Sequence, residues 1–381
     1  MKTYLKALAR AGVATLALTA VARAEIKIGA TLSETGPAAF LGDPEAKTLK
    51  MMVEEINAAG GVKGEKIKLT VYDDGGDASK ARTFATRLIE EDGVVAIIGG
   101  SVTGAAMAVI PVAEEAKVPF IALAGAIEII DPVRPYVFKT PHTDRMACEK
   151  IFEDMKTRGF TKIGMISGTD GFGASMRKQC LDVAGKYGVS IVADESYGPK
   201  DTDMTPQLTN IRSKSDVQAI LNPGFGQGPS IVTRNYAQLG IKTPFYQSHG
   251  VASDGFIKLA GAQAAEGVRL PAGALLIAGI LPGDDPQKKV VTDYKAAYEK
   301  AANEPVSTFG GYAYDAMLIL VDAMKRAKSL KGPDIRDAIE GTQKLVGATG
   351  VFTFTPKDHL GLDLSAFRML EIQKGGWTLA K

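Results

Sequence analysis

The feature that most constrains the fold is a regular alternation of short β-branched runs with longer stretches of helical period, which begins at Glu25. After the first run, apolar residues recur at three-and-four spacing, the pattern of a helix with one buried face: Leu49, Met52, Val53 and Ile56. Strands that alternate with helices in this order favour parallel sheets with helices on both faces. The sequence therefore predicts an α/β protein built from doubly wound parallel sheets.

The alternation occurs in two blocks, residues 25–140 and 144–268, joined by the loop "FKTPHTD". Roughly 357 residues follow the first 24, whereas a single core rarely serves more than about 250–300 residues. Two domains are therefore expected, with Asp144 as the cap of the helix that opens the second block. Further helices are predicted over 286–302 and 307–327, and one closing strand in "FRMLEIQKGGW".

Residues 1–24 have the pattern of a secretory leader. An Ala/Leu/Val-rich stretch follows three basic residues, Lys2, Lys6 and Arg10, and Ala22-Arg23-Ala24 places small residues around a cleavage position. An anchoring helix is the alternative, but the apolar run is shorter than the ~20 residues that span a bilayer. We therefore expect export to the periplasm, with the leader removed after Ala24.

Charge excludes several classes of partner. The chain has 45 basic and 43 acidic side chains, and the leader holds four of the basic ones, so 41 basic and 43 acidic side chains remain, a net charge of −2. No basic run or basic stripe interleaved with aromatics is present, which argues against nucleic acid as a partner. After the leader, no stretch is long and apolar enough to cross a membrane.

The motifs of nucleotide binding and hydrolysis are missing. The glycines of "GTDGFG" (168–173) stand in the wrong order for a dinucleotide-binding turn, and neither a phosphate-binding P-loop nor a G-x-S-x-G elbow occurs. His142, His249 and His359 are far apart, and none has a partner at a metal-ligand spacing. A secreted α/β enzyme would need a nucleophile–base pair or a metal cluster, so we expect neither an enzyme nor a cofactor.

The two cysteines leave two alternatives open. Cys148 and Cys180 are the only thiols, and in an oxidising compartment they are suited to form one disulfide. Each also falls on the apolar stripe of a predicted helix, which suits two buried reduced cysteines equally well. Sequence alone does not place their Cα atoms within the ~7 Å that a disulfide requires.

Ligands of doubly wound sheets bind outside the carboxyl ends of the strands, so the loops that leave the strands are the candidate site. In "IIGGSVTGAAMAVIP", a strand leads through hydroxyl residues into a helix, whose free N–H groups suit a carboxylate without any Lys or Arg. Simple helix capping is the alternative. The candidate residues of this loop and of the next, "ALAGAIE", are Ser101, Val102, Thr103, Ala124, Gly125 and Ala126.

Six segments along the chain match one family in order and spacing: "IKIGATLSETGPAAFLG", "INAAGGVKGEKIKLTVYDD", "IIGGSVTGAAMAVIPVAEEAKVPFI", "VFKTPHTD", "GTDGFGAS" and "YAQLGIKTPFYQSHG". The chain resembles the type I periplasmic binding proteins of the Leu/Ile/Val-binding family, the extracytoplasmic receptors of ABC importers. The resemblance covers the whole chain after the leader.

The resemblance implies two α/β lobes that are joined by a three-stranded hinge and close on a ligand. It places the crossovers near 141–143, 269–272 and 346–356. The N-terminal lobe would comprise 25–141 and 272–350, and the C-terminal lobe 142–271 and 351–381. It also implies an ABC permease in the inner membrane as the partner, and we expect a monomer.

The resemblance also assigns roles to individual residues. A hydroxyl in Ser101-Val102-Thr103 would hold the carboxylate of the ligand, assisted by the positions of Ala124 and Ala126. Ala126 stands where relatives have threonine, so its N–H remains but a side-chain donor is lost. Phe172 and Phe225 would form the aromatic wall, where relatives often have tyrosine; ordinary core packing is the alternative.

The loop "FYQSHG" bears on the class of ligand. In relatives that bind α-amino acids, an acidic residue at the position of His249 accepts the ammonium of the ligand. Removing one partner of a buried charge pair costs about 3–5 kcal/mol, whereas imidazole can donate to an oxygen. If His249 is instead a neutral loop residue, an acid elsewhere would have to bind the ammonium.

We therefore expect a small carboxylic acid without an α-amino group, most plausibly aromatic and benzoate-like. Phe172 and Phe225 would enclose its ring, with Phe40 and Leu41 beside the first loop. In this respect the chain resembles the aromatic-acid-binding members of the family. A fatty or dicarboxylic acid fits the same anion site, and a branched-chain amino acid or amide is the alternative within the family.

Overall fold

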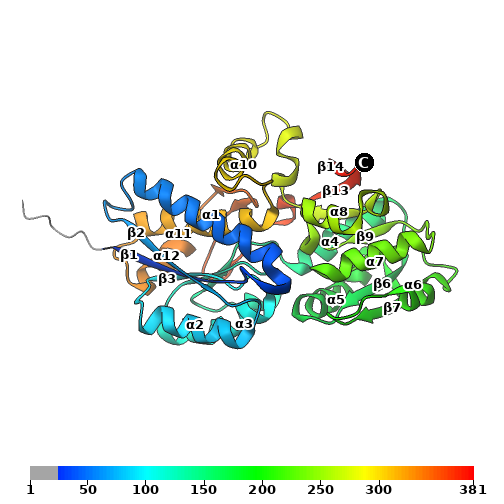
Figure 1. Ribbon diagram of the computed structural model, residues 1–381, viewed down its shortest axis with the longest axis horizontal. Coiled ribbons are helices and arrows are strands. Elements are labelled where there is room, and N and C mark those ends of the chain that lie inside the picture. Colours follow the sequence, from blue (N-terminus) through cyan, green and yellow to red (C-terminus); the bar gives the residue numbers. More distant parts are fainter. Residues whose placement is uncertain (1–24) are drawn as a thin grey trace, which may run out of the picture.

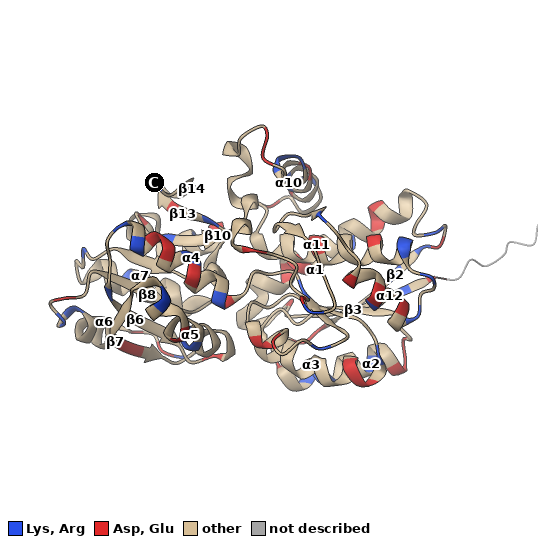
Figure 2. Cartoon of the chain, turned by 180° about the vertical axis from the view of Figure 1, so that it is seen from behind, with Lys and Arg blue, Asp and Glu red and all other residues tan. Residues whose placement is uncertain are grey.

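The computed structural model describes residues 25–381, and the leader predicted over residues 1–24 lies outside the described residues. The chain forms two α/β lobes that lie side by side along the longest axis (Figure 1). Lys and Arg are interspersed with Asp and Glu over both lobes (Figure 2). This architecture confirms the predicted doubly wound α/β class.

The first lobe contains a parallel five-stranded sheet in the order β2-β1-β3-β4-β5. Its β1, "IKIGATL", is buried at every position except Lys27, as expected for a strand covered on both faces. The strands are β1 (Ile26–Leu32), β2 (Ile67–Asp73), β3 (Ala96–Gly99), β4 (Phe120–Ala122) and β5 (Val137–Lys139). Helices α1 (Ala39–Ala58), α2 (Ala78–Glu90), α3 (Thr103–Ala116), α10 (Lys288–Ala302), α11 (Thr308–Arg326) and α12 (Gly332–Glu340) accompany them.

The second lobe contains a seven-stranded sheet in the order β14-β13-β10-β9-β8-β6-β7. Its strands are β6 (Lys162–Gly168), β7 (Ser190–Tyr197), β8 (Ala219–Asn222), β9 (Phe245–Gln247), β10 (Arg269–Ala272), β13 (Arg368–Gln373) and β14 (Gly376–Leu379). Its helices are α4 (Asp144–Thr157), α5 (Gly171–Ala184), α6 (Thr205–Arg212), α7 (Gln227–Gln238), α8 (Asp254–Ala260) and α9 (Ala262–Ala265).

The end of the chain differs from the single closing strand that was predicted. β13 and β14 form an antiparallel hairpin at the edge of the second sheet. Lys374 and Gly375 between them both have positive φ, 52° and 73°, which is the backbone of the tight turns that suit strand twist. The run "QKGGW" therefore reverses the chain, and the single-strand prediction was wrong there.

The third crossover between the lobes lies later in the chain than residue 351, where the boundary was expected. After the short hairpin of β11 (Leu345–Val346) and β12 (Val351–Phe352), the chain stays against β5. The ring of Phe354 packs edge-on against Phe138 at 5.8 Å, and Lys139 N donates to His359 O at 3.2 Å. Residues 352–359 therefore contact the first sheet, and residues 368–379 pair in the second.

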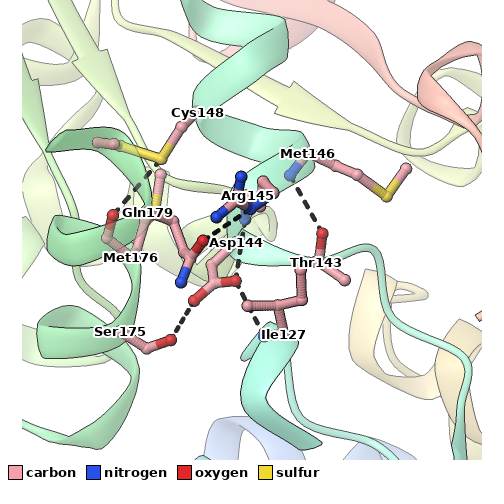
Figure 3. Close-up of a disulfide and its surroundings, with 10 residues drawn as sticks. Ile127, Thr143, Asp144, Arg145, Met146, Cys148, Ser175, Met176 and Gln179 are labelled. Carbon is pink, nitrogen blue, oxygen red and sulfur yellow. Dashed lines mark hydrogen bonds between the residues drawn. A yellow bond between two sulfur atoms is a disulfide. The ribbon is translucent and has the colours of Figure 1, made fainter. Parts of the chain in front are cut away.

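The cap of α4 also differs from the prediction. Thr143, not Asp144, is the N-cap, and its side chain accepts a hydrogen bond from Met146 N at 3.1 Å. Asp144 is the first residue of the helix, and its carboxylate instead accepts from Ile127 N in the first lobe and from Ser175 Oγ on α5 (Figure 3). Asp144 therefore ties a loop of the first lobe to two helices of the second.

Of the two alternatives left open for the cysteines, the structure contains the disulfide. Cys148 on α4 and Cys180 on α5 are bonded, with their Cα atoms 5.1 Å apart (Figure 3). Both residues are fully buried between the two helices. The bond closes a loop with a sequence separation of 32 residues, which restricts the unfolded chain more than the folded one.

Replacing both cysteines by alanine is expected to lower the free energy of unfolding by about 3–4 kcal/mol, because the loop-closure entropy is lost. Chemical denaturation, read by circular dichroism, measures the change. Dithiothreitol should lower the wild-type midpoint and leave that of the double variant unmoved. A wild-type midpoint that ignores the reductant while free thiols appear would contradict the prediction.

Candidate functional site

A cavity of about 40 Å³ lies where the two lobes meet. It opens beside a larger cleft of about 650 Å³, with which it shares four lining residues, Val102, Thr103, Phe172 and Phe225. The cavity is lined by Leu41, Ser101, Val102, Thr103, Leu123, Ala124, Gly125, Pro141, Phe172, Phe225, His249, Gly250, Phe309 and Tyr312. Much of the lining comes from segments that follow strands of both sheets, where doubly wound folds bind ligands, and α1 and α11 supply the rest.

Most of the residues singled out from the sequence meet at this cavity. Phe40 and Ala126 are the two that do not line it. The ring of Phe40 instead lies between those of Phe225 and Phe309, with centroids 6.2 and 5.5 Å away, so it packs behind the wall. Ala126 is fully buried one residue beyond the lining.

The hydroxyls of Ser101 and Thr103 do not cap α3. The N-cap of this helix is Val102, which provides no side-chain hydrogen bond. Thr103 Oγ1 is buried without a hydrogen-bond partner within residues 25–381. Because Thr103 lines both the cavity and the outer cleft, its hydroxyl is available to a bound molecule.

Ser101 is engaged within the protein. Its Oγ accepts from Ser33 N at 3.1 Å and lies 2.5 Å from Glu45 Oε2, to which it donates. Burial raises the pKa of Glu45 well above its usual value, the hydrogen bond from Ser101 lowers it, and the charge of Asp74 raises it. A protonated Glu45 would reverse this bond and donate to Ser101. The proton of Ser101 would then be free for a ligand.

The loop that carries Gly125 is held by hydrogen bonds to its backbone. Gly125 O accepts from Lys139 Nζ at 2.9 Å and from Asp144 N at 3.0 Å. The next residues continue the link, since Ile127 N donates to Asp144 Oδ1 at 2.9 Å. These bonds fix the backbone of the loop relative to α4 in the second lobe.

The second lobe supplies an aromatic wall. The rings of Phe172 and Phe225 meet edge to face at 6.1 Å, and Phe172 meets His249 at 5.4 Å. Burial lowers the pKa of His249 well below its usual value, and the charges of His142 and Lys139 lower it further. The imidazole is therefore neutral at pH 7, and its Nδ1 is buried without a hydrogen-bond partner within residues 25–381. In the tautomer that carries its proton on Nδ1, this nitrogen can donate to an acceptor.

Sequence reasoning missed part of the lining. Phe309 and Tyr312 come from α11, which follows more than 200 residues after the loop of Ser101. Their spacing of three places them on one helical face, a pattern that indicates burial but not a return to the cleft. The other missed residues, Leu123, Pro141 and Gly250, adjoin predicted segments.

Within residues 25–381, no cluster of three or more His, Cys, Asp or Glu side chains is arranged to hold a metal ion. In the same part of the chain, no helix has the length and apolar character needed to cross a membrane.

Comparison with known proteins identifies the family. The family model described as periplasmic binding protein matches residues 25–376. The Leu/Ile/Val-binding protein homolog 7 of Brucella abortus (strain 2308) is 28% identical over 350 residues, covering 87% of this chain and 85% of that protein. The chain therefore belongs to the periplasmic binding protein family, and it is a substrate-binding receptor of the Leu/Ile/Val-binding type.

Solved structures agree with this assignment. An extracellular ligand-binding receptor from Rhodopseudomonas palustris HaA2 superimposes with a TM-score of 0.87 at 31% identity, covering 94% of this chain and 100% of that one. The branched-chain amino acid transporter substrate binding protein LivJ from Streptococcus pneumoniae str. Canada MDR_19A, in complex with isoleucine, gives a TM-score of 0.82 at 26% identity, covering 94% and 99%. Proteins of this family are extracytoplasmic receptors for small molecules.

Gly125 lies where the two lobes touch, so a larger residue there is expected to act as a wedge. A Cβ atom added at Gly125 would lie 2.8 Å from Phe172 Cε2 and 3.0 Å from His249 Nε2, both on the second lobe. Overpacking of this kind typically costs about 1–3 kcal/mol, and here it would destabilise the form in which the two lobes touch. Gly125→Ala should therefore weaken ligand binding about tenfold or more. Isothermal calorimetry measures the affinity.

Gly104→Ala is the matched control, because an added Cβ there meets nothing within 4 Å although Gly104 lines the outer cleft. It should bind like wild type. Equal affinities for Gly125→Ala and Gly104→Ala would show that the lobes do not close to the observed contact when ligand binds.

Proposed function

We propose that this receptor binds a small carboxylic acid without an α-amino group, namely a benzoate-like aromatic acid. The observation that carries the proposal is the chemistry of the cavity lining, which contains no Asp, Glu, Lys or Arg side chain. Its polar groups are hydroxyls, an imidazole and backbone amides.

The lining suits an anion better than an ammonium. The Thr103 hydroxyl lacks a protein partner, and the neutral His249 can present an N–H, so both can donate to a carboxylate. An α-ammonium would find no carboxylate in the lining. Leaving it unpaired in a buried site costs about 3–5 kcal/mol, which is enough to reverse a preference between an acid and an amino acid.

The apolar part of the lining favours a ring. Phe172 and Phe225 meet at nearly perpendicular planes, 88° apart, and the rings of Phe309 and Tyr312 face the same cavity from the first lobe. Aromatic side chains arranged in this way offer both edges and faces to a flat ligand. A flexible aliphatic chain would lose more conformational entropy on entering the same space.

A branched-chain amino acid is the second candidate. It is supported by the relatives, which are named Leu/Ile/Val-binding protein homologs, and by the structurally similar LivJ in complex with isoleucine. The apolar wall would accept such a side chain. The missing acidic side chain in the lining argues against it.

The proposal extends to the partner and compartment. The family assignment supports delivery of the ligand to an ABC permease, after export to the periplasm and removal of residues 1–24. Closure of two lobes on a ligand gives the permease a means to distinguish loaded from empty receptor. We propose that the receptor acts as a monomer.

A thermal-shift screen tests the proposed ligand class. A ligand that binds only the folded protein stabilises it by RT ln(1 + [L]/Kd). We expect benzoate and hydroxybenzoates to raise the melting temperature more than leucine, isoleucine or phenylalanine at equal concentration. A larger shift with the amino acids would establish the second candidate in place of the first.

Replacing His249 by Glu is expected to change the preference among ligands. A carboxylate at this position would repel the carboxylate of an acid in a poorly solvated site and would offer an acceptor to an ammonium. The ratio of benzoate to leucine affinity should therefore fall, as measured by calorimetry on both proteins.

His249→Gln is the control for this change, because it keeps a neutral donor and adds no charge. It should preserve the ratio seen in wild type. If His249→Glu leaves the ratio unchanged too, His249 does not determine the class of ligand.

A further inference from the structure

Lys139 is a buried cation that the ligand site, as described so far, does not use. It is the last residue of β5, and its side chain is fully buried. Its ammonium donates to two backbone carbonyls, Gly125 O at 2.9 Å and His142 O at 3.2 Å. A buried ammonium normally pairs with a carboxylate, because desolvation of an unpaired charge costs several kcal/mol.

Within residues 25–381, no carboxylate accepts a hydrogen bond from this ammonium. Asp144 is the one acidic group whose charge acts on Lys139. Its Oδ1 already accepts from Ile127 N and Arg145 N, and its Oδ2 accepts from Ser175 Oγ. Burial also raises the pKa of Asp144, which shows that it too is held in a poorly solvated place.

The peptide that joins Gly125 to Ala126 connects this ammonium to the cavity lining, since Gly125 lines the cavity and Ala126, the next residue, is fully buried. Its carbonyl oxygen points at Lys139 Nζ. In a trans peptide the N–H points the opposite way from the carbonyl, so the N–H of Ala126 is directed away from Lys139. This N–H makes no backbone hydrogen bond within residues 25–381, and Gly125 itself lines the cavity.

We propose that Lys139 is a positioning residue for the anionic end of the ligand, acting as its counter-ion through the Gly125–Ala126 peptide. The ammonium polarises the carbonyl, and the N–H of the same peptide becomes a stronger donor to the carboxylate of the ligand. The cavity lining contains no charged side chain, but the ammonium of Lys139 then acts on the ligand through a single peptide group. The inference rests on the proposed function, since it requires a carboxylate ligand.

The charge of Lys139 is sensitive to its surroundings. Burial lowers its pKa to about 7, and the charge of Asp144 opposes this effect. The other titratable groups that interact with it are His142 and His249, and the charge of Lys139 lowers the pKa of both rings. Both are neutral near pH 7, so the titration of Lys139 itself governs the local charge there.

The sign of the pH dependence follows from linkage. A bound carboxylate raises the pKa of Lys139 above its value of about 7 in the ligand-free protein. Binding is then favoured when Lys139 is protonated, and affinity falls as the pH rises through 7 towards the higher pKa of the complex. A rise of one pKa unit corresponds to about a tenfold loss of affinity.

The test compares Lys139→Met with wild type on matched pairs of probes. Benzoate and benzamide share a ring and differ in the negative charge. We expect Lys139→Met to weaken benzoate about tenfold or more at pH 6.5, with little effect on benzamide, and to remove the fall in benzoate affinity between pH 6.5 and 8.5. Lys139→Arg, which keeps the charge, should retain more affinity for benzoate than the Met variant does.

Lys63→Met controls for the loss of an ammonium-to-carbonyl bond elsewhere. Lys63 Nζ donates to Ala327 O at 2.6 Å, at the far end of α11 from Phe309. This variant should bind both probes like wild type. Circular dichroism and the melting temperature report whether each variant is folded.

The two proposals can fail separately. If wild type binds leucine and not benzoate, the aromatic-acid function is overturned, and leucine with leucinol, which lacks the carboxylate, replaces the first pair. The inference would be overturned if Lys139→Met lost the same amount of affinity for the charged and the uncharged probe. It would also be overturned if the affinity of wild type for the charged probe did not change with pH around pH 7. Binding of no carboxylate at all overturns both.

Discussion

The packing of the crossovers around the imidazole of His142 is the constraint on which the two-lobe arrangement depends. The ring stacks on Phe367, from the third passage, with centroids 3.7 Å apart. A Cβ added at Gly273, in the second passage, would lie 3.6 Å from His142 Cε1 and 3.7 Å from Thr349 O. Burial lowers the pKa of His142 to about 3, so the ring is neutral at physiological pH. Relative motion of the lobes must therefore occur around one closely packed centre whose imidazole is neutral.

The same ring is connected to the ligand cavity by direct contacts. Phe172 meets His249 at 5.4 Å, His249 meets Phe367 at 5.4 Å, and Phe367 stacks on His142. A molecule held against Phe172 and His249 thus touches the first members of a series that ends in the hinge. This series of contacts is a physical route by which binding in the cavity can be coupled to the movement of the lobes. The coupling free energy depends on how the contacts differ between the open and closed forms. His249 therefore belongs to both parts, since it lines the cavity and also contacts Phe367.

The fold and much of the candidate site could be predicted from sequence because they depend on local pattern. The strand–helix alternation predicted the parallel sheets, and the loops that follow strands predicted that Ser101 and Gly125 lie at one site. The place of Phe172 was implied by the family resemblance. Tyr312, Glu45 and Lys139 could not be found in this way. Tyr312 and Glu45 contact residues that are far away in sequence: Tyr312 is 172 residues from Thr140, and Glu45 is 56 residues from Ser101. Lys139 is close in sequence to Gly125 and His142, but a single lysine at the end of a strand gives no pattern that shows where its ammonium bonds. The hairpin after Gln373 was missed because two positive φ values in "KGG" outweigh the strand propensity around them.

Specificity and closure have a common origin in the buried polar atoms of this site. In the part of the chain that the structure describes, Thr103 Oγ1 and His249 Nδ1 have no hydrogen-bond partner, and the Lys139 ammonium bonds to two carbonyls and to no carboxylate. Each unsatisfied group costs about 1–3 kcal/mol in the closed form, whereas water can reach the site when the lobes separate. A ligand that satisfies these groups therefore stabilises the closed form over the open one, and by more than its apolar contacts alone provide. A molecule of the same shape with the wrong polar groups would fill the cavity and leave that cost in place, so it would bind without driving closure.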